Sequence, residues 1–392
     1  MAPRPRPFDI VHVSSAHPWT DNRVHLRAAG SAATAGYRTA LIAVAAAGDA
    51  PDPDWDSPDP DTGVYVRRIP ARRRSRRVLV SSVQAVCAAL SSRAPIVHLH
   101  DPELLWAVPV LRCLHRTVVY DAHEDLPDQV RGKEYLGPVA RRASTMAAHA
   151  ALAVARGSST VIAATPTIAR RFPADRTVLV RNVPQLRAAD TEAHAVTDRD
   201  RVVVYIGSMS RDRGIDVLAG VASSPALPDG WRMLTAGPID GAVDRRAFDE
   251  LVRTGRIDHR GVVRPRAARD LLVTARIGLL PLFPTPAYAA SIPTKLFEYL
   301  AAGLAVVATD VPLWRELLAG TDCATWVPPG DPEAIVAAIR RYDDDPELLR
   351  NHAEAGRALV LERFRWDREE QVLLDLYRSL SGAAPVPEAV AR

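Results

Sequence analysis

The fold follows from one stretch of the chain, Ser291-Ile292-Pro293-Thr294-Lys295-Leu296-Phe297-Glu298-Tyr299-Leu300-Ala301-Ala302-Gly303. Apolar runs flank it at 277–282 and 304–309, and each has the length of a buried strand. Pro293 suits the entry of a helix, because the first backbone N–H groups of a helix have no partner within it. The stretch therefore predicts a strand–helix–strand unit of a parallel sheet.

Lys295 and Glu298 lie three positions apart, so on this helix they share one face. The free N–H groups near Thr294–Leu296 and the Lys295 ammonium suit a phosphate, and Glu298 can accept hydrogen bonds from paired sugar hydroxyls. In most proteins a Lys–Glu pair on a helix is only a solvated surface pair. The position favours a ligand site, because ligands of open α/β sheets bind beyond the carboxyl ends of the strands.

Composition indicates a globular protein of two domains. The chain has 392 residues, of which 47% are hydrophobic and 24% charged. A formal charge of +4 is small for this length, so we expect no nucleic-acid partner. Three scattered cysteines argue against a disulfide framework or a zinc site and favour a reducing compartment. We find neither the apolar region of a signal peptide nor an apolar stretch long enough to span a bilayer, and we expect a cytoplasmic protein.

Short apolar runs alternate with helical patterns along the whole chain, which predicts an α/β fold with two doubly wound parallel sheets. The strands expected in the first half are 9–14, 39–43, 96–100, 117–121, 160–163 and 177–180, with a hairpin-like piece at 64–69. The strands expected in the second half are 202–206, 231–236, 257–261, 277–282, 305–309 and 325–327. We predict domains at 1–190 and 200–365, a linker near 186–201, and a final helix, 366–380, that packs back on the first domain.

The segment 203–215 reads as a strand, a loop and a helix. Gly207 lets the backbone approach a ligand, and Arg211 or Arg213 can direct a cation at a phosphate. The segment lacks the Gly-x-Gly-x-x-Gly fingerprint of dinucleotide binding and the Gly-Lys-Ser/Thr ending of a P-loop.

Three polar segments of the first half follow strands: 21–23, 98–103 and 121–125. The residues that we expect on the acceptor side of a site are Asp21, Arg23, Asp101, Glu103 and Glu124. The His and carboxylate clusters suggest metal ligands, but neighbours in an extended chain point opposite ways and rarely converge on one ion. We therefore expect no metal, and a histidine that hydrogen-bonds a substrate hydroxyl or phosphate.

The run Arg72-Arg73-Arg74-Ser75-Arg76-Arg77 is the one dense cluster of charge. It is interpreted first as a solvated loop. The alternative is peripheral contact with an anionic membrane surface, at the inner face of the membrane, or with a phosphate-bearing acceptor.

The chain resembles the retaining glycosyltransferases of family 4, which have the GT-B architecture of two Rossmann-like domains. The likeness runs over roughly 8–380. The segments that carry it are Pro-Thr-Lys-Leu-Phe-Glu-Tyr-Leu-Ala-Ala-Gly (293–303), Gly-Ser-Met-Ser-Arg-Asp-Arg-Gly (207–214), His-Asp-Pro-Glu-Leu (100–104), Tyr-Asp-Ala-His-Glu-Asp (120–125), Arg-Asn-Val-Pro (181–184) and Arg-Phe-Arg-Trp (363–366).

The resemblance implies a role for each matched residue. Glu298 would hold the donor ribose, Lys295 and Arg213 would lie near the donor diphosphate, and His123 would lie beside the transferred sugar. The implied catalytic residues are His123, Arg213 and Lys295. The implied donor-binding residues are Gly207, Ser208, Arg213, Gly261, Val263, Thr294, Lys295, Leu296 and Glu298. The chain departs from the family pattern at Ala290, where such enzymes often carry glutamate, and at Ser208, where they often carry arginine. It also has Asp21-Asn22-Arg23 in place of the first-domain glycine-rich loop.

The expected reaction moves a hexose from a nucleotide diphosphate sugar, UDP- or GDP-linked, to an acceptor hydroxyl with retention at the anomeric carbon. No cofactor is expected, and fixed cations would stabilise the leaving diphosphate without a metal. The acceptor can be a glycan, a lipid-linked saccharide or a small natural product. Two alternatives stay open: a catalytically silent nucleotide-sugar-binding subunit and a GT-B epimerase. A dehydrogenase is disfavoured, because the dinucleotide fingerprint is absent.

Overall fold

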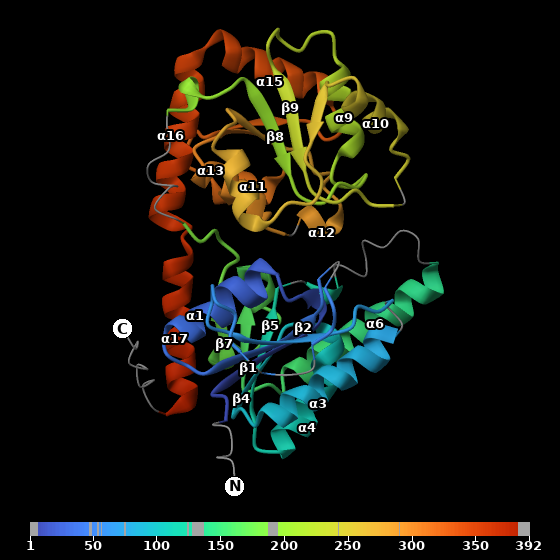
Figure 1. The fold of residues 1–392 in the computed structure, drawn as a ribbon, viewed down its shortest axis with the longest axis vertical. Coiled ribbons are helices and arrows are strands. Elements are labelled where there is room, and N and C mark those ends of the chain that lie inside the picture. The colour runs from blue at the N-terminus through green and yellow to red at the C-terminus, as the bar shows by residue number, and fades with distance from the viewer. Residues whose placement is uncertain are drawn as a thin grey trace. The chain divides into compact units, whose positions relative to one another are not determined.

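The computed structural model describes residues 7–46, 49–52, 55, 57–73, 76–123, 125–127, 137–186, 195–241, 243–289 and 291–382. Its contacts divide the chain into two compact units, Met1–Asn182 with Trp366–Arg392 and Val183–Arg365. Each unit is a parallel α/β sheet with helices on both faces (Figure 1). The predicted fold class, two Rossmann-like domains, is confirmed.

The first unit contains a seven-stranded sheet in the order β3-β2-β1-β4-β5-β6-β7, and every pairing in it is parallel. Its strands are β1 (Ile10–Pro18), β2 (Thr39–Val44), β3 (Tyr65–Ile69), β4 (Ile96–Leu99), β5 (Thr117–Ala122), β6 (Thr160–Ala163) and β7 (Thr177–Leu179). Its helices are η1 (Asn22–Ala29), α1 (Gly30–Thr34), η2 (Arg77–Ser81), α3 (Ser82–Ser92), η3 (Pro102–Ala107), α4 (Val108–Cys113), α6 (Pro138–Ala155), α7 (Pro166–Ala169), η4 (Ala174–Arg176) and α17 (Trp366–Ser381).

One local expectation for the first unit was wrong. The segment near 64–69 is not half of a hairpin, because β3 joins the edge of the sheet parallel to β2. Among the described residues, the backbone of the proline- and aspartate-rich loop before it pairs with β3 through isolated antiparallel bridges, at Asp52–Arg68 and Pro58–Tyr65. Pro58 has no N–H to donate, and prolines and aspartates are depleted in strands, so the described part of this loop forms no second strand.

Helix α17 closes one face of the first sheet (Figure 1). Its buried residues Trp366, Leu373 and Tyr377 pack in one cluster with Ile10 of β1. The Trp366 Nε1–H also donates to the Ser31 hydroxyl at 3.0 Å. Helix α17 is therefore part of the first unit's core.

The second unit contains a six-stranded parallel sheet in the order β10-β9-β8-β11-β12-β13. Its strands are β8 (Val202–Ile206), β9 (Arg232–Ala236), β10 (Ile257–His259), β11 (Ile277–Leu280), β12 (Ala305–Thr309) and β13 (Ala324–Val327). Its helices are η5 (Val196–Asp198), α9 (Ile215–Ser223), α10 (Arg246–Arg253), α11 (Pro265–Leu272), α12 (Pro286–Ala289), α13 (Thr294–Ala301), α14 (Pro312–Leu317), α15 (Pro332–Asp344) and α16 (Pro346–Arg363).

The end of the predicted linker belongs to the second unit's core. Arg199 is buried, and its Nη1 donates to the carbonyls of Ala275 and Ala302 at 3.2 and 2.9 Å. Arg276 in turn donates to the Arg199 carbonyl at 2.7 Å. Sequence alone missed this anchoring because the segment has no strand or helix period.

No helix of the described residues is long and apolar enough to cross a membrane.

Candidate active site

In the second unit the strand order reverses between β8 and β11, and the predicted donor loops follow these two strands. A ligand site of an open α/β sheet is expected at such a point. The loop 207–214 lies against the segment after β11, where the Phe283 N–H donates to the Asp212 carbonyl at 2.9 Å. Gly214 has φ +80°, and a Cβ at this position would overlap the Pro281 carbonyl. The close approach of these two loops therefore requires glycine.

Lys295 lies in the first turn of α13 and reaches back to the end of β8. Its Nζ donates to the Tyr205 hydroxyl at 2.9 Å and lies 4.2 Å from the centre of that ring. Gly207 has φ +137°, and a Cβ there would overlap the Lys295 side chain. Burial, together with the charge of nearby Arg213, lowers the pKa of Lys295 to about 7. A negatively charged ligand would therefore stabilise the protonated form of Lys295.

Arg213 supplies the second cation of this site. Its Nε donates to the Tyr288 hydroxyl at 2.9 Å, and its Nη1 lies 3.5 Å from the Ser208 carbonyl. Burial alone would lower the pKa of Arg213, but the Tyr288 hydroxyl raises it, so the guanidinium stays charged. Ser208 also accepts, through its carbonyl, the Tyr205 hydroxyl proton at 2.9 Å. Tyr205 therefore links the lysine to the loop that carries the arginine.

Two hydrogen bonds position α13 against the sheet. The Ile206 N–H at the end of β8 donates to the Tyr299 hydroxyl at 2.9 Å, and Gly278 of β11 leaves room for the Tyr299 ring. The Trp314 Nε1–H donates to the Ser291 carbonyl at 2.9 Å and holds the loop before α13. Helix α13 is thus fixed at both its start and its middle.

The helix entry differs in one detail from the expectation. Pro293 is the N-cap, and no side chain of the described residues caps this end. The Leu296 N–H donates to the Pro293 carbonyl at 3.1 Å, and the Leu296 side chain is fully buried in the core. Leu296 is therefore a packing residue, and only Thr294 and Lys295 can offer N–H groups to a ligand. Glu298 lies half-buried on the same face of the helix as Lys295. The charge of Glu298 opposes part of the lowering of the Lys295 pKa.

Three strands of this sheet end in glycines with positive φ: Gly207, Gly237 and Gly261, at +137°, +133° and +63°. The Gly207 N–H donates to the Ala236 carbonyl and the Gly237 N–H to the Gly261 carbonyl, both at 2.7 Å. A Cβ on Gly237 would overlap the Gly207 backbone. The three turns form one backbone floor beside Lys295, and half-buried Val263 follows the last of them.

In the first unit, the carboxylate of Asp101 organises the last residues of β1. It accepts the Ser14 hydroxyl at 2.8 Å, the Ser15 N–H at 2.6 Å and the Ala16 N–H at 3.0 Å, and it lies 2.8 Å from His17 Nδ1. Burial alone would raise the pKa of Asp101, but these donors hold it well below its usual range. Asp101 is 1% exposed, so it shapes the site from beneath.

His17 and His123 meet at the surface of the first unit, with ring centres 5.3 Å apart. The His123 Nδ1 lies 3.9 Å from Asp121, whose carboxylate accepts Arg23 Nε and Nη2 at 2.8 and 2.7 Å. Burial would raise the pKa of Asp121, but Arg23 and His100 hold it far below its usual value. A carboxylate that Arg23 holds in place therefore lies next to His123.

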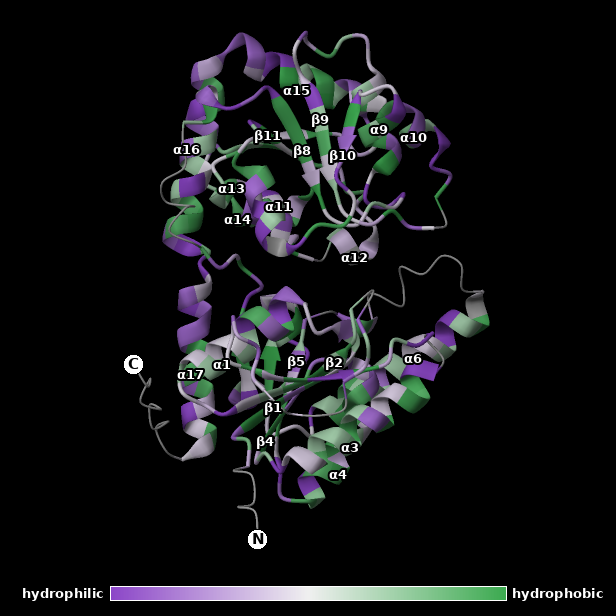
Figure 2. Cartoon of the chain, in the orientation of Figure 1, coloured by the Kyte–Doolittle hydropathy of each residue, from purple (hydrophilic) through white to green (hydrophobic). Residues whose placement is uncertain are grey.

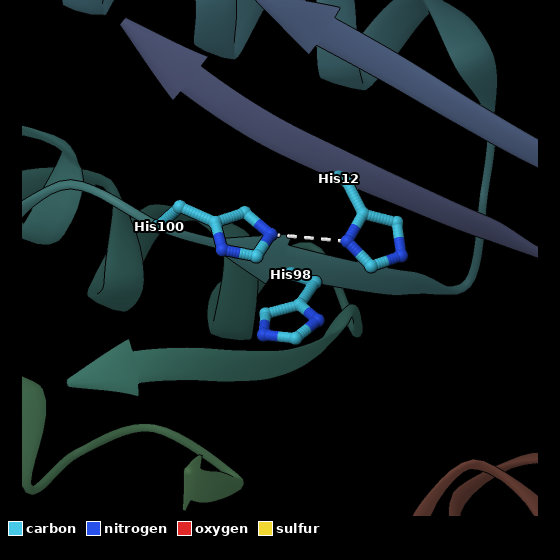
Figure 3. Close-up of side chains that lie close together, drawn as sticks. All are labelled: His12, His98 and His100. Carbon is cyan, nitrogen blue, oxygen red and sulfur yellow. Dashed lines mark hydrogen bonds between the residues drawn. The ribbon is translucent and has the colours of Figure 1, made fainter. Parts of the chain in front are cut away.

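A buried histidine cluster lies under this surface (Figure 3). His12 Nδ1 and His100 Nε2 are 3.0 Å apart, His100 Nδ1 lies 3.1 Å from Asp121, and His98 Nδ1 lies 2.7 Å from the Tyr377 hydroxyl. The cluster has the residue types of a metal site, but the His98 and His100 rings stack with centres 4.3 Å apart. Because the lone pair of an imidazole lies in its ring plane, stacked rings do not converge on one ion. The three histidines do not meet a substrate, since each is at most 1% exposed.

We expect the first unit to lose stability when the pH falls below about 6.5. Burial and the neighbouring histidines hold the pKa values of His12 and His98 well below the ordinary value, whereas both groups bind protons in the unfolded chain. Two such groups give a slope of at most about 2.7 kcal/mol per pH unit. Urea unfolding at pH 7.5 and 5.5 measures this slope, and His98→Gln should remove about half of it. Equal slopes for both proteins would contradict the assignment.

The acceptor-side residues predicted from sequence are mostly engaged within the first unit. Asp21 caps η1, where its Oδ1 accepts the N–H groups of Arg23 and Val24, both at 2.8 Å. Glu103 Oε1 accepts Arg77 Nε at 2.6 Å. Glu124 and Ala290 lie outside the described residues. Their acceptor roles stay predictions.

Sequence reasoning missed Tyr205 and Gly237 beside the cations of the second unit, and His17 beside His123 in the first unit. His17 stands at the carboxyl end of the first strand, and Gly237 directly follows a predicted strand, so both positions gave a signal. Tyr205 gave none, because within an apolar strand it reads as core.

Residues 200–345 match the family model described as glycosyl transferases group 1. This match identifies the chain as a glycosyltransferase. Its two parallel Rossmann-like units give it the GT-B fold.

Alpha-maltose-1-phosphate synthase from Mycolicibacterium smegmatis is 25% identical over 358 residues, which cover 82% of this chain and 89% of that protein. Phosphatidyl-myo-inositol mannosyltransferase from the same organism is 32% identical over 88 residues, 22% of each chain.

Among solved structures, sucrose-phosphate synthase from Thermosynechococcus elongatus superposes with a TM-score of 0.72 at 20% identity, over 95% of this chain and 99% of that one. Anabaena HepE in complex with UDP-glucose gives a TM-score of 0.66 at 15% identity, over 95% of this chain and 100% of that one. At these identities the likeness shows the fold alone.

Proposed function

We propose that this protein is a retaining, metal-independent glycosyltransferase of family 4 that moves a hexosyl unit from a UDP- or GDP-sugar to an acceptor hydroxyl. The observation that carries the proposal is the pair of cations, Lys295 and Arg213, fixed through Tyr205 and Tyr288 beside the backbone floor at Gly207. The complexes of HepE with UDP and with UDP-glucose support a nucleotide sugar as the donor.

Lys295 and Arg213 would hold the diphosphate and stabilise the negative charge that develops as the bond between the anomeric carbon and the phosphate oxygen breaks. The acceptor oxygen forms the new bond on the same face of the sugar, and its proton passes to the leaving phosphate. This step needs no base from the protein and relies on positioning. Glu298 would accept the ribose hydroxyls, and His123 would lie beside the transferred sugar.

Calorimetric titration with UDP, GDP and ADP tests the donor assignment. We expect micromolar binding of one nucleotide and at least about a tenfold loss in Glu298→Ala, because a carboxylate that accepts ribose hydroxyls contributes about 1.5–3 kcal/mol. Glu347→Ala is the matched control, since Glu347 is an exposed glutamate at the start of α16. Absence of binding by all three nucleotides would contradict the proposal.

A further inference from the structure

The first unit carries a long segment with charge of one sign. Between Asp61 and Asp101 the chain contains eight arginines and no aspartate or glutamate. This segment includes η2 and α3, which pack on the face of the sheet at β1 and β2. A helix that covers a sheet normally buries its apolar face and shows a polar one to water.

The outward side of η2 and α3 is apolar instead. Leu79 is 72% exposed, Val80 and Val83 are each 46% exposed, and Val78 is 40% exposed. The side that faces the sheet buries Ser81 and Ser82 together with small apolar residues such as Ala85. Figure 2 shows the hydrophobic residues along α3. Exposed apolar residues that are contiguous, rather than scattered singly, mark a surface that docks on something.

Trp106 of η3 extends this surface. Its side chain is 44% exposed, and its Nε1–H points to the Ser82 hydroxyl at 3.4 Å, which places the indole at the start of α3. Tryptophan has an apolar body and a polar N–H, and it is enriched where a protein meets a lipid headgroup region. We call Val78, Leu79, Val80, Val83 and Trp106 the apolar ridge.

Some of the arginines beside the apolar ridge are hydrogen-bonded within the first unit, and others are exposed. Arg72 donates to the Ser81 hydroxyl and to Gln84 at 3.2 and 2.8 Å, and Arg77 pairs with Glu103 at 2.6 Å, so these two hold the ridge in place. Arg73 and Arg76 are exposed beside it. Of the run from Arg72 to Arg77 that the sequence suggested for membrane contact, Arg73 and Arg76 are the exposed arginines among the described residues, and Arg74 and Ser75 lie outside them.

We propose that the apolar ridge docks on an anionic lipid surface, with its aliphatic side chains and Trp106 at the acyl boundary and Arg73 and Arg76 on headgroup phosphates. Charge favours this occupant over a second copy of the chain. In a twofold contact the same arginines from both copies would face one another. The inference is independent of the donor nucleotide, because it uses no residue of the second unit.

Vesicle co-sedimentation tests the proposal, with the full chain and with vesicles of phosphatidylcholine alone or mixed with phosphatidylglycerol. We expect the protein to bind the mixed vesicles and to dissociate as salt is raised. The double variant Leu79→Gln/Val83→Gln should bind at least about tenfold more weakly, and Arg73→Gln/Arg76→Gln about tenfold more weakly. Val372→Gln and Arg246→Gln are matched controls at exposed positions on α17 and α10, and they should bind like the unmodified protein.

Three results would overturn the proposal. The first is no binding of the unmodified protein to mixed vesicles, and the second is unchanged binding of Leu79→Gln/Val83→Gln. The third is a dimer, measured by light scattering, that this double variant dissociates, because the ridge would then be covered by a second copy. Unchanged melting temperatures of the variants show that the effect is on the surface and not on folding.

Discussion

Lys295→Met is expected to lower kcat/KM for donor hydrolysis by about 100- to 1000-fold, which is the usual loss when one fixed donor to a developing oxyanion is removed. Methionine keeps most of the length of the side chain beneath Tyr205 but carries no charge. The ammonium is held 2.9 Å from the Tyr205 hydroxyl next to Gly207, so the substitution removes a charge that is fixed at this point. Release of nucleotide from the sugar donor into water measures the effect without knowledge of the acceptor.

Arg246→Met is the control for this substitution, because the Arg246 side chain is 90% exposed on the same unit and pairs with the surface residue Asp244. It should retain full activity. A rate for Lys295→Met within threefold of the unmodified protein, with an unchanged melting temperature, would remove Lys295 from the catalytic residues.

Binding of the donor nucleotide is expected to weaken roughly thirtyfold between pH 7 and pH 9, and the cause is the titration of Lys295. Burial and the charge of Arg213 lower the pKa of Lys295 to about 7 in the free protein. A bound diphosphate favours the charged form and raises this pKa, so binding takes up a proton. Nucleotide affinity is therefore highest where Lys295 is already protonated, and it falls as the pH rises from about 7 toward the pKa of Lys295 in the complex.

Titrations in two buffers of different ionisation enthalpy measure the proton directly. Uptake should be about half a proton per nucleotide at pH 7 and nearly one at pH 8. Lys295→Met should bind weakly and equally at both pH values. A pH-independent affinity of the unmodified protein, without proton uptake, would show that Lys295 does not meet the diphosphate.

Local periodicity was sufficient to predict the sheets. The strands at 202–206 and 305–309 were placed to the residue, because each is a short apolar run between a turn and a helical pattern. The segment near 64–69 was misread as a hairpin, because its parallel partner β2 is fixed by topology and not by the loop before it. The linker was drawn too long, since the anchoring of Arg199 depends on carbonyls more than 70 residues away.

The candidate site was predictable where the chemistry resides in one segment. Lys295, Glu298 and the entry at Pro293 are adjacent in sequence, and helix geometry brings them together. The supporting residues were not predictable in this way. The Tyr205 hydroxyl accepts a hydrogen bond from Lys295 only because Gly207 leaves room for the lysine side chain. Asp101 holds the end of β1 only because β1 and β4 are neighbours in the sheet. Both facts depend on pairings of distant segments.

The measurement that tests the central claim most directly is a crystal structure of the protein with the nucleoside diphosphate that binds in calorimetry. The account predicts diphosphate oxygens within about 3 Å of the Lys295 Nζ and the Arg213 guanidinium, above Gly207, with the ribose hydroxyls on Glu298. A nucleotide bound elsewhere, or bound here with its diphosphate turned away from both cations, would contradict it.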